Sequence, residues 1–132
     1  MSVSQNIEIV KQANNAFNTV GAEGFAEFLN EDVIDYFPFD RKPLMGKKSI
    51  VEDNIEFRKM FKDLRVEIIN IFGQDDWVCF QAYVTGTHSG GNSIRVPICN
   101  IVKLKDGKIS EVHEYFDQSS FTAQMQSKLK SS

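Results

Sequence analysis

The chain has 132 residues, of which 42% are hydrophobic and 25% charged, and its formal net charge is −3 at pH 7. This length predicts one domain over residues 1–132 with a substantial core. The slightly acidic charge, with Lys and Arg scattered along the chain, argues against nucleic-acid binding. No apolar run approaches the ~20 residues of a membrane-spanning helix, and the N-terminus lacks the charged and apolar regions of a secretory signal. We therefore expect a cytoplasmic protein that binds neither nucleic acid nor membrane.

Helical periodicity comes first along the chain. Val10, Ala13 and Phe17 recur at helical spacing, Ser4 can cap the start of this helix and Gly21 fits its end. The same reasoning predicts helices over residues 4–20, 22–29, 47–61 and 118–129.

Strand patterns alternate with these helices and then dominate. They cover residues 33–39, 64–72, 77–88, 94–104 and 109–116. Pro38 places the first strand at a sheet edge or ends it. Helices followed by an antiparallel meander predict an α+β domain in which helices cover one face of a sheet.

The hairpin registers assign side chains to the two faces of the sheet. Asp106-Gly107 predicts a two-residue turn that pairs Lys105 with Lys108, so Asn100 would lie opposite His113. A loop over residues 89–93 would place Ala82 opposite Asn100. Because side chains alternate, one mostly apolar face is expected to form the interior. This face contains Ala82, Val84, Ile98, Asn100, Val102, Leu104, His113, Tyr115 and Asp117.

The two cysteines and two histidines do not suggest a disulfide or a metal site. The predicted register separates Cys79 from Cys99 by roughly 13 Å at ~3.3 Å per residue, which is too far for a disulfide. No ligand spacing typical of a zinc site is present. We expect the cysteines to be packing residues and the protein to use no metal or other cofactor.

The predicted interior face holds three polar side chains among apolar ones. Asn100, His113 and Asp117 would each cost roughly 1–3 kcal/mol if buried without a partner. Either they satisfy one another or they face a cavity that holds water or a ligand. Each also has a simpler interpretation: Asp117 as a helix N-cap, His113 as a structural histidine, and Asn100 as an amide that satisfies strand neighbours.

The C-terminal pattern DGKI-x5-YFD-x3-F-x2-Q, over residues 106–124, resembles that of the SnoaL-like proteins in the nuclear transport factor 2-like superfamily. This resemblance implies a cystatin-like fold in which a cone-shaped, curved antiparallel sheet wraps over N-terminal helices. It also implies acid–base chemistry without a cofactor, with an acting Asp at position 117. Related ketosteroid isomerases carry an oxyanion-stabilising acid where Asn100 stands.

Two better-defined catalytic sets of the superfamily are incomplete in this chain. The isomerase general base would fall at Phe37. The Arg and Asp of limonene-epoxide hydrolases would fall at Ala82 and Val84; their Tyr is matched by Tyr36, but their neighbouring Asn becomes Pro38.

These observations lead to two hypotheses. In the first, the protein is a small acid–base enzyme acting on an apolar, carbonyl-bearing molecule: Asp117 moves a proton, His113 assists, and Asn100 and Tyr36 stabilise negative charge. In the second, it is a non-catalytic binding or dimerisation module of the same fold. A homodimer is expected through the outer sheet face at Trp77, Tyr83 and Ile101. The residues expected to contact the small molecule are Phe17, Phe37, Leu44, Phe57, Ala82, Val84, Ile98 and Tyr115.

Overall fold

The computed structural model describes residues 1–37 and 41–130, with side chains described as far as residue 126. The elements are α1 (Val3–Thr19), α2 (Ala22–Ala26), β1 (Leu29–Tyr36), β2 (Leu44–Met45), α3 (Lys47–Met60), β3 (Phe61–Gln74), β4 (Trp77–His88), β5 (Ser93–Lys105), β6 (Lys108–Phe116) and α4 (Gln118–Lys130). The predicted order of helices and strands is therefore confirmed.

The differences from prediction lie at element ends. Ser2 rather than Ser4 caps α1, because Ser2 forms a reciprocal capping box with Gln5. The short β2 was not predicted. Strand β1 begins at Leu29, four residues before the predicted start at residue 33. The predicted extension of that strand through Pro38 and Phe39 lies outside the described residues.

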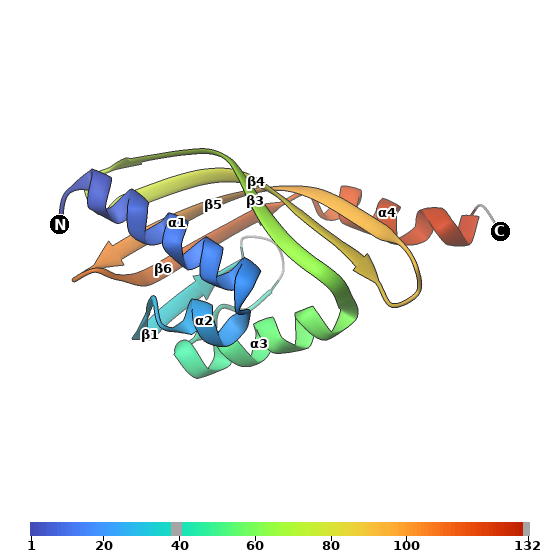
Figure 1. Ribbon diagram of the computed structural model, residues 1–132, viewed down its shortest axis with the longest axis horizontal. Coiled ribbons are helices and arrows are strands. Elements are labelled where there is room, and N and C mark those ends of the chain that lie inside the picture. The colour runs from blue at the N-terminus through green and yellow to red at the C-terminus, as the bar shows by residue number, and fades with distance from the viewer. Residues whose placement is uncertain (38–40, 131–132) are drawn as a thin grey trace.

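Six strands form one curved, open sheet in the order β2-β1-β6-β5-β4-β3. Neighbours pair antiparallel except for β1 and β6, so the predicted antiparallel sheet contains one parallel pair. In Figure 1, α1, α2 and α3 lie on one side of the curved sheet, and α4 extends beyond its other end.

Helix α1 is fixed to β3 by apolar packing and by paired amide contacts. Its Val10 and Ala13 are buried in the main core. The Asn18 side chain donates to the Val66 carbonyl at 2.8 Å and accepts from the Val66 N–H at 2.8 Å. Asn14 donates to the same carbonyl at 3.1 Å. These contacts hold the helix across the sheet and set the space between them.

A bulge in β6 decides which residues of that strand face inward. The Asp106-Gly107 turn is confirmed, with φ of 52° and 78°, and Lys105 pairs with Lys108. The register then slips: Leu104 pairs with Ile109, but Lys103 pairs with Glu111. Ser110 is the extra residue, and one extra residue moves every later side chain to the opposite face from that predicted.

The consequence is an exchange of faces along the second half of β6. Asn100 lies opposite Glu114, not His113. The interior placement predicted for His113, Tyr115 and Asp117 is therefore wrong, and Val112, Glu114 and Phe116 point inward instead.

The β4–β5 hairpin differs from its predicted register by two residues, which leaves the faces unchanged. Ala82 pairs with Ile98 instead of Asn100. The same shift brings the two cysteines together: the Sγ atoms of Cys79 and Cys99 lie 3.8 Å apart, and both thiols are free. The predicted separation of about 13 Å is wrong because the true loop is shorter.

Candidate functional site

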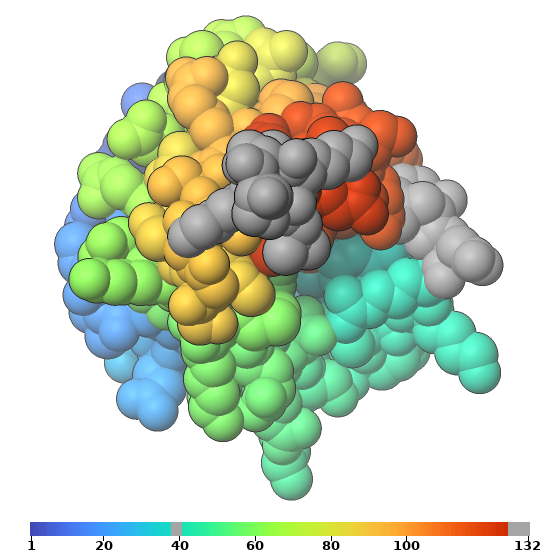
Figure 2. Space-filling view, turned by 90° about the vertical axis from the view of Figure 1, so that its right-hand side faces the viewer, coloured from blue at the N-terminus to red at the C-terminus, as the bar shows by residue number. Residues whose placement is uncertain are grey.

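A cavity of about 300 Å³ lies between the inner face of the sheet and the helices. Its wall is mostly apolar and rich in phenylalanine. Figure 2 shows the surface hollowed between α4 and the segment around α3. A volume of this order falls at the lower end of the range for small-molecule pockets. The phenylalanines that line it are Phe17, Phe25, Phe37, Phe57, Phe80, Phe116 and Phe121.

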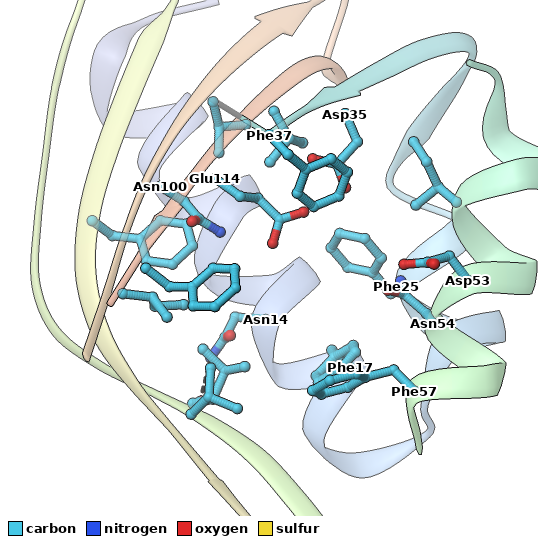
Figure 3. Close-up of a pocket in the computed structure, with 18 of the residues that line it drawn as sticks. Asn14, Phe17, Phe25, Asp35, Phe37, Asp53, Asn54, Phe57, Asn100 and Glu114 are labelled. Carbon is cyan, nitrogen blue, oxygen red and sulfur yellow. Dashed lines mark hydrogen bonds between the residues drawn. The ribbon is translucent and has the colours of Figure 1, made fainter. Parts of the chain in front are cut away.

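Three adjacent strands place polar side chains together on this wall. Asp35 comes from β1, Glu114 from β6 and Asn100 from β5, and these strands are neighbours in the sheet. Strand alternation puts Asp35 on the same face as the fully buried Val33. In Figure 3, Asp35 and Glu114 extend toward one another, with Asn100 beside Glu114.

Asp35 is the most perturbed carboxyl among the described residues. Only 6% of the residue is exposed. Burial raises the pKa of Asp35 far above its ordinary value, and the hydrogen bond and charge of Glu114 raise it further. Asp35 therefore keeps its proton at neutral pH. Two carboxyls so close in an apolar wall share a proton because both cannot easily ionise there.

Two buried oxygens on this wall have unused hydrogen-bonding capacity. Among the described residues, Asp35 Oδ1 and Asn100 Oδ1 are the buried side-chain oxygens that have no hydrogen-bond partner. Asn100 is 9% exposed. A buried polar atom without a partner costs about 1–3 kcal/mol. Both residues line the cavity, so a molecule that enters it can supply the missing hydrogen-bond partners.

An ion pair also lines the cavity that contains Asp35, Asn100 and Glu114. Arg41 Nη2 donates to Asp53 Oδ1 at 2.6 Å, and the Arg41 guanidinium lies 4.3 Å from the centre of the Phe37 ring. Arg41, Asp53 and the adjacent Asn54 all line the cavity. The Asp53 charge adds to the rise in the pKa of Asp35, whereas the Arg41 charge opposes it.

Comparison with known proteins assigns this chain to a family. The model of the SnoaL-like polyketide cyclase family matches residues 7–125. The chain belongs to this family. A search of curated proteins found no match.

Solved structures share the fold at low sequence identity. IdmH, a proposed polyketide cyclase from Streptomyces antibioticus, has a TM-score of 0.81 at 20% identity, over 92% of this chain and 98% of that one. An LEH-like epoxide hydrolase from M. tuberculosis has a TM-score of 0.81 at 16% identity, over 96% of this chain and 93% of that one. A protein with a ketosteroid isomerase-like fold from Catenulispora acidiphila, solved with trimethylamine, has a TM-score of 0.81 at 19% identity. The match covers 89% of this chain and 91% of that one. These likenesses confirm the predicted nuclear transport factor 2-like fold.

In this SnoaL-like chain, Asp117, for which the resemblance implies a catalytic role, caps a helix. Asp117 is exposed, and its Oδ1 accepts from the Ser120 N–H at 2.9 Å. Its carbonyl accepts from the Phe121 N–H at 3.0 Å. Asp117 is thus the N-cap of α4, which was the alternative interpretation of this residue.

His113 and Tyr36 lie together, but on the outer face of the sheet. Their rings stack with centroids 4.6 Å apart, and Trp77 lies 5.9 Å from His113. His113 Nε2 is 3.8 Å from a carboxylate oxygen of Glu111. Neither His113 nor Tyr36 lines the cavity, so the structure does not bring them to Asn100.

The predicted binding residues divide into two groups. Leu44 packs against the main core and Ala82 is buried in it, whereas Tyr115 is 44% exposed. None of these three residues lines the cavity. The predicted residues that do line the cavity are Phe17, Phe37, Phe57, Val84, Ile98 and Asn100.

Sequence reasoning missed Asp35 and Glu114 for different reasons. Alternation with Val33 in the segment Val33-Ile34-Asp35 could have revealed Asp35 as an inward-facing acid. Glu114 was assigned to the outer face because the bulge at Ser110 was not foreseen.

Within residues 1–37 and 41–130, no group of three or more His, Cys, Asp or Glu side chains could hold a metal ion. None of the described helices is long and apolar enough to span a bilayer.

Proposed function

We propose that this protein is a cofactor-independent acid–base enzyme that moves a proton on a small, mostly apolar carbonyl compound bound in the cavity. One observation carries the proposal: Asp35 and Glu114 face the cavity as a pair beside Asn100. A pair of acids whose environments push their pKa values apart can divide the acid and base roles at neutral pH.

The two acids take different roles because their environments differ. Glu114, which is partly exposed, acts as the carboxylate that removes a proton from the carbon next to the carbonyl. Asp35 keeps its proton and donates a hydrogen bond to the carbonyl oxygen, where negative charge develops. The Asn100 amide N–H donates to the same oxygen. A positioned base of this kind contributes roughly 10²–10⁴-fold to rate.

The phenylalanine wall supports this chemistry. It binds the apolar part of the substrate and keeps water from the reacting atoms. Hydrogen bonds to a developing oxyanion are stronger in such a low-dielectric space than in water.

Deuterium exchange tests the proposal without knowledge of the natural substrate. Acetophenone, phenylacetone and α-tetralone are incubated with the protein in D₂O, and loss of the α-proton signal is followed by NMR. The native chain is expected to accelerate exchange of at least one ketone, and Glu114→Gln to lower this rate about 100-fold. Glu111→Gln, on the outer face of the same strand, is the matched control and is expected to leave the rate unchanged.

Equal exchange rates in the native chain and Glu114→Gln would contradict the proposal. Ketones that bind to the native chain without any accelerated exchange would instead favour a non-catalytic binding module.

A further inference from the structure

We infer that the preferred ligand of the cavity is a cation: a small, mostly apolar molecule with a protonated amine or iminium nitrogen placed beside Glu114. This inference rests on the proposed function, since it names the substrate class of the same cavity.

The charges on the wall do not balance. Arg41 and Asp53 form an ion pair and cancel one another. No ion pair among the described residues includes Glu114. With Asp35 protonated, the Glu114 carboxylate leaves the cavity with one uncompensated negative charge. A monovalent cation neutralises that charge, whereas an anion would be repelled by it.

The unpaired oxygen of Asn100 requires a donor. Asn100 Oδ1 belongs to a residue that is more than nine-tenths buried, lines the cavity and has no hydrogen-bond partner for this oxygen among the described residues. A carbonyl or ether oxygen on a ligand cannot satisfy this oxygen, because it only accepts. A primary ammonium group offers three N–H donors, which can satisfy both Asn100 Oδ1 and the Glu114 carboxylate.

The rest of the wall suits an organic cation better than a metal or a simple ion. Seven phenylalanine rings line the cavity, and aromatic rings attract cations through their faces. A strongly hydrated inorganic ion would lose its water there without enough oxygen ligands to replace it. A positive nitrogen next to the reacting carbon also makes the proton on that carbon more acidic, which is the proton that Glu114 is proposed to remove.

Isothermal titration calorimetry tests this inference with three ligands of one shape and different charge. Benzylammonium, benzyl alcohol and benzoate are titrated into the native chain at pH 7. Benzylammonium is expected to bind at least about tenfold more tightly than benzyl alcohol, as a charge-assisted hydrogen bond implies. Benzoate is expected not to bind. Benzylammonium that binds no more tightly than benzyl alcohol, or no binding by either, would overturn the inference.

Two variants locate the effect. Glu114→Gln is expected to remove the preference for the ammonium ligand and to retain binding of benzyl alcohol, whereas Glu111→Gln is expected to preserve the preference. A preference that survives in Glu114→Gln would also overturn the inference. Because calorimetry needs no turnover, an ammonium preference without ketone exchange would leave this inference standing while the proposed catalysis fails.

Discussion

At the scale of single residues, Asp35 is the feature that departs most from the pattern of the fold. It occupies an inward position of β1, where its neighbour on the same face, Val33, is fully buried. Replacing that carboxyl with an apolar residue would relieve the burial cost, so its presence in the wall points to a function for this acid.

The raised pKa of Asp35 predicts a pH dependence of stability. Below about pH 3, the carboxyl is largely protonated in both the folded and the unfolded chain. Above the ordinary Asp pKa of about 3.9, the unfolded carboxyl loses its proton while the folded one retains it, so stability falls by up to about 1.4 kcal/mol per pH unit. Asp35→Asn removes this loss. The variant is expected to gain stability relative to the native chain as pH rises from 4 to 7.

Urea unfolding at several pH values measures this difference. Asp32→Asn is the control, because Asp32 is exposed on the same strand. A constant difference between Asp35→Asn and the native chain across this pH range would show that Asp35 is ionised in the folded state.

At the scale of elements, the sequence predicted what depends on periodicity and failed where a bulge intervenes. The limits of β4 and the Asp106-Gly107 turn follow from strand alternation and from a strong turn signal. Ser110 has no comparable signal, since an ordinary residue can occupy a bulge. Because this bulge is not visible in the sequence, the prediction places Glu114 on the outer face and puts His113 and Asp117 wrongly on the inner face. Asn100 is predicted correctly, because the register of β5 with β4 differs from the prediction by an even number of residues.

The bulge itself gives a testable prediction. Ser110 has no cross-strand partner in β5, so its deletion would join Ile109 to Glu111 and leave Glu114 facing inward. The deletion variant is expected to fold cooperatively. Its free energy of unfolding is expected to fall by at most about 3 kcal/mol, which includes loss of the hydrogen bond from the Ser110 hydroxyl to the Lys103 carbonyl. Deleting Lys103 instead would break the registers with both β4 and β6 and is expected to prevent folding.

Circular dichroism with urea unfolding distinguishes these two deletions. An unfolded Ser110 deletion beside a folded Lys103 deletion would contradict the assigned register.

At the scale of the whole molecule, the two faces of the sheet have different characters. The inner face encloses the cavity, and the outer face carries aromatic and cationic groups in contact. Lys103 lies 5.6 Å from the Trp77 ring centre, and Arg95 lies 3.6 Å from that of Tyr83. Tyr, Trp and Arg are enriched at protein interfaces, so the outer face remains our predicted homodimer contact.

Light scattering at micromolar concentration tests this prediction. The native chain is expected to show twice the monomer mass of 15.0 kDa, and Ile101→Arg, in the centre of the outer face, to show the monomer mass. A native particle of 15.0 kDa would contradict the dimer.

The proposed function depends on an inward-facing pair of acids that holds one proton at neutral pH. Carbon-13 NMR of the side-chain carboxyls, followed from pH 3 to pH 9, observes this proton directly. We predict that the Asp35 carboxyl carbon keeps the chemical shift of the protonated acid at pH 7. An Asp35 signal that titrates near its ordinary pKa of about 3.9 would contradict the proposed function.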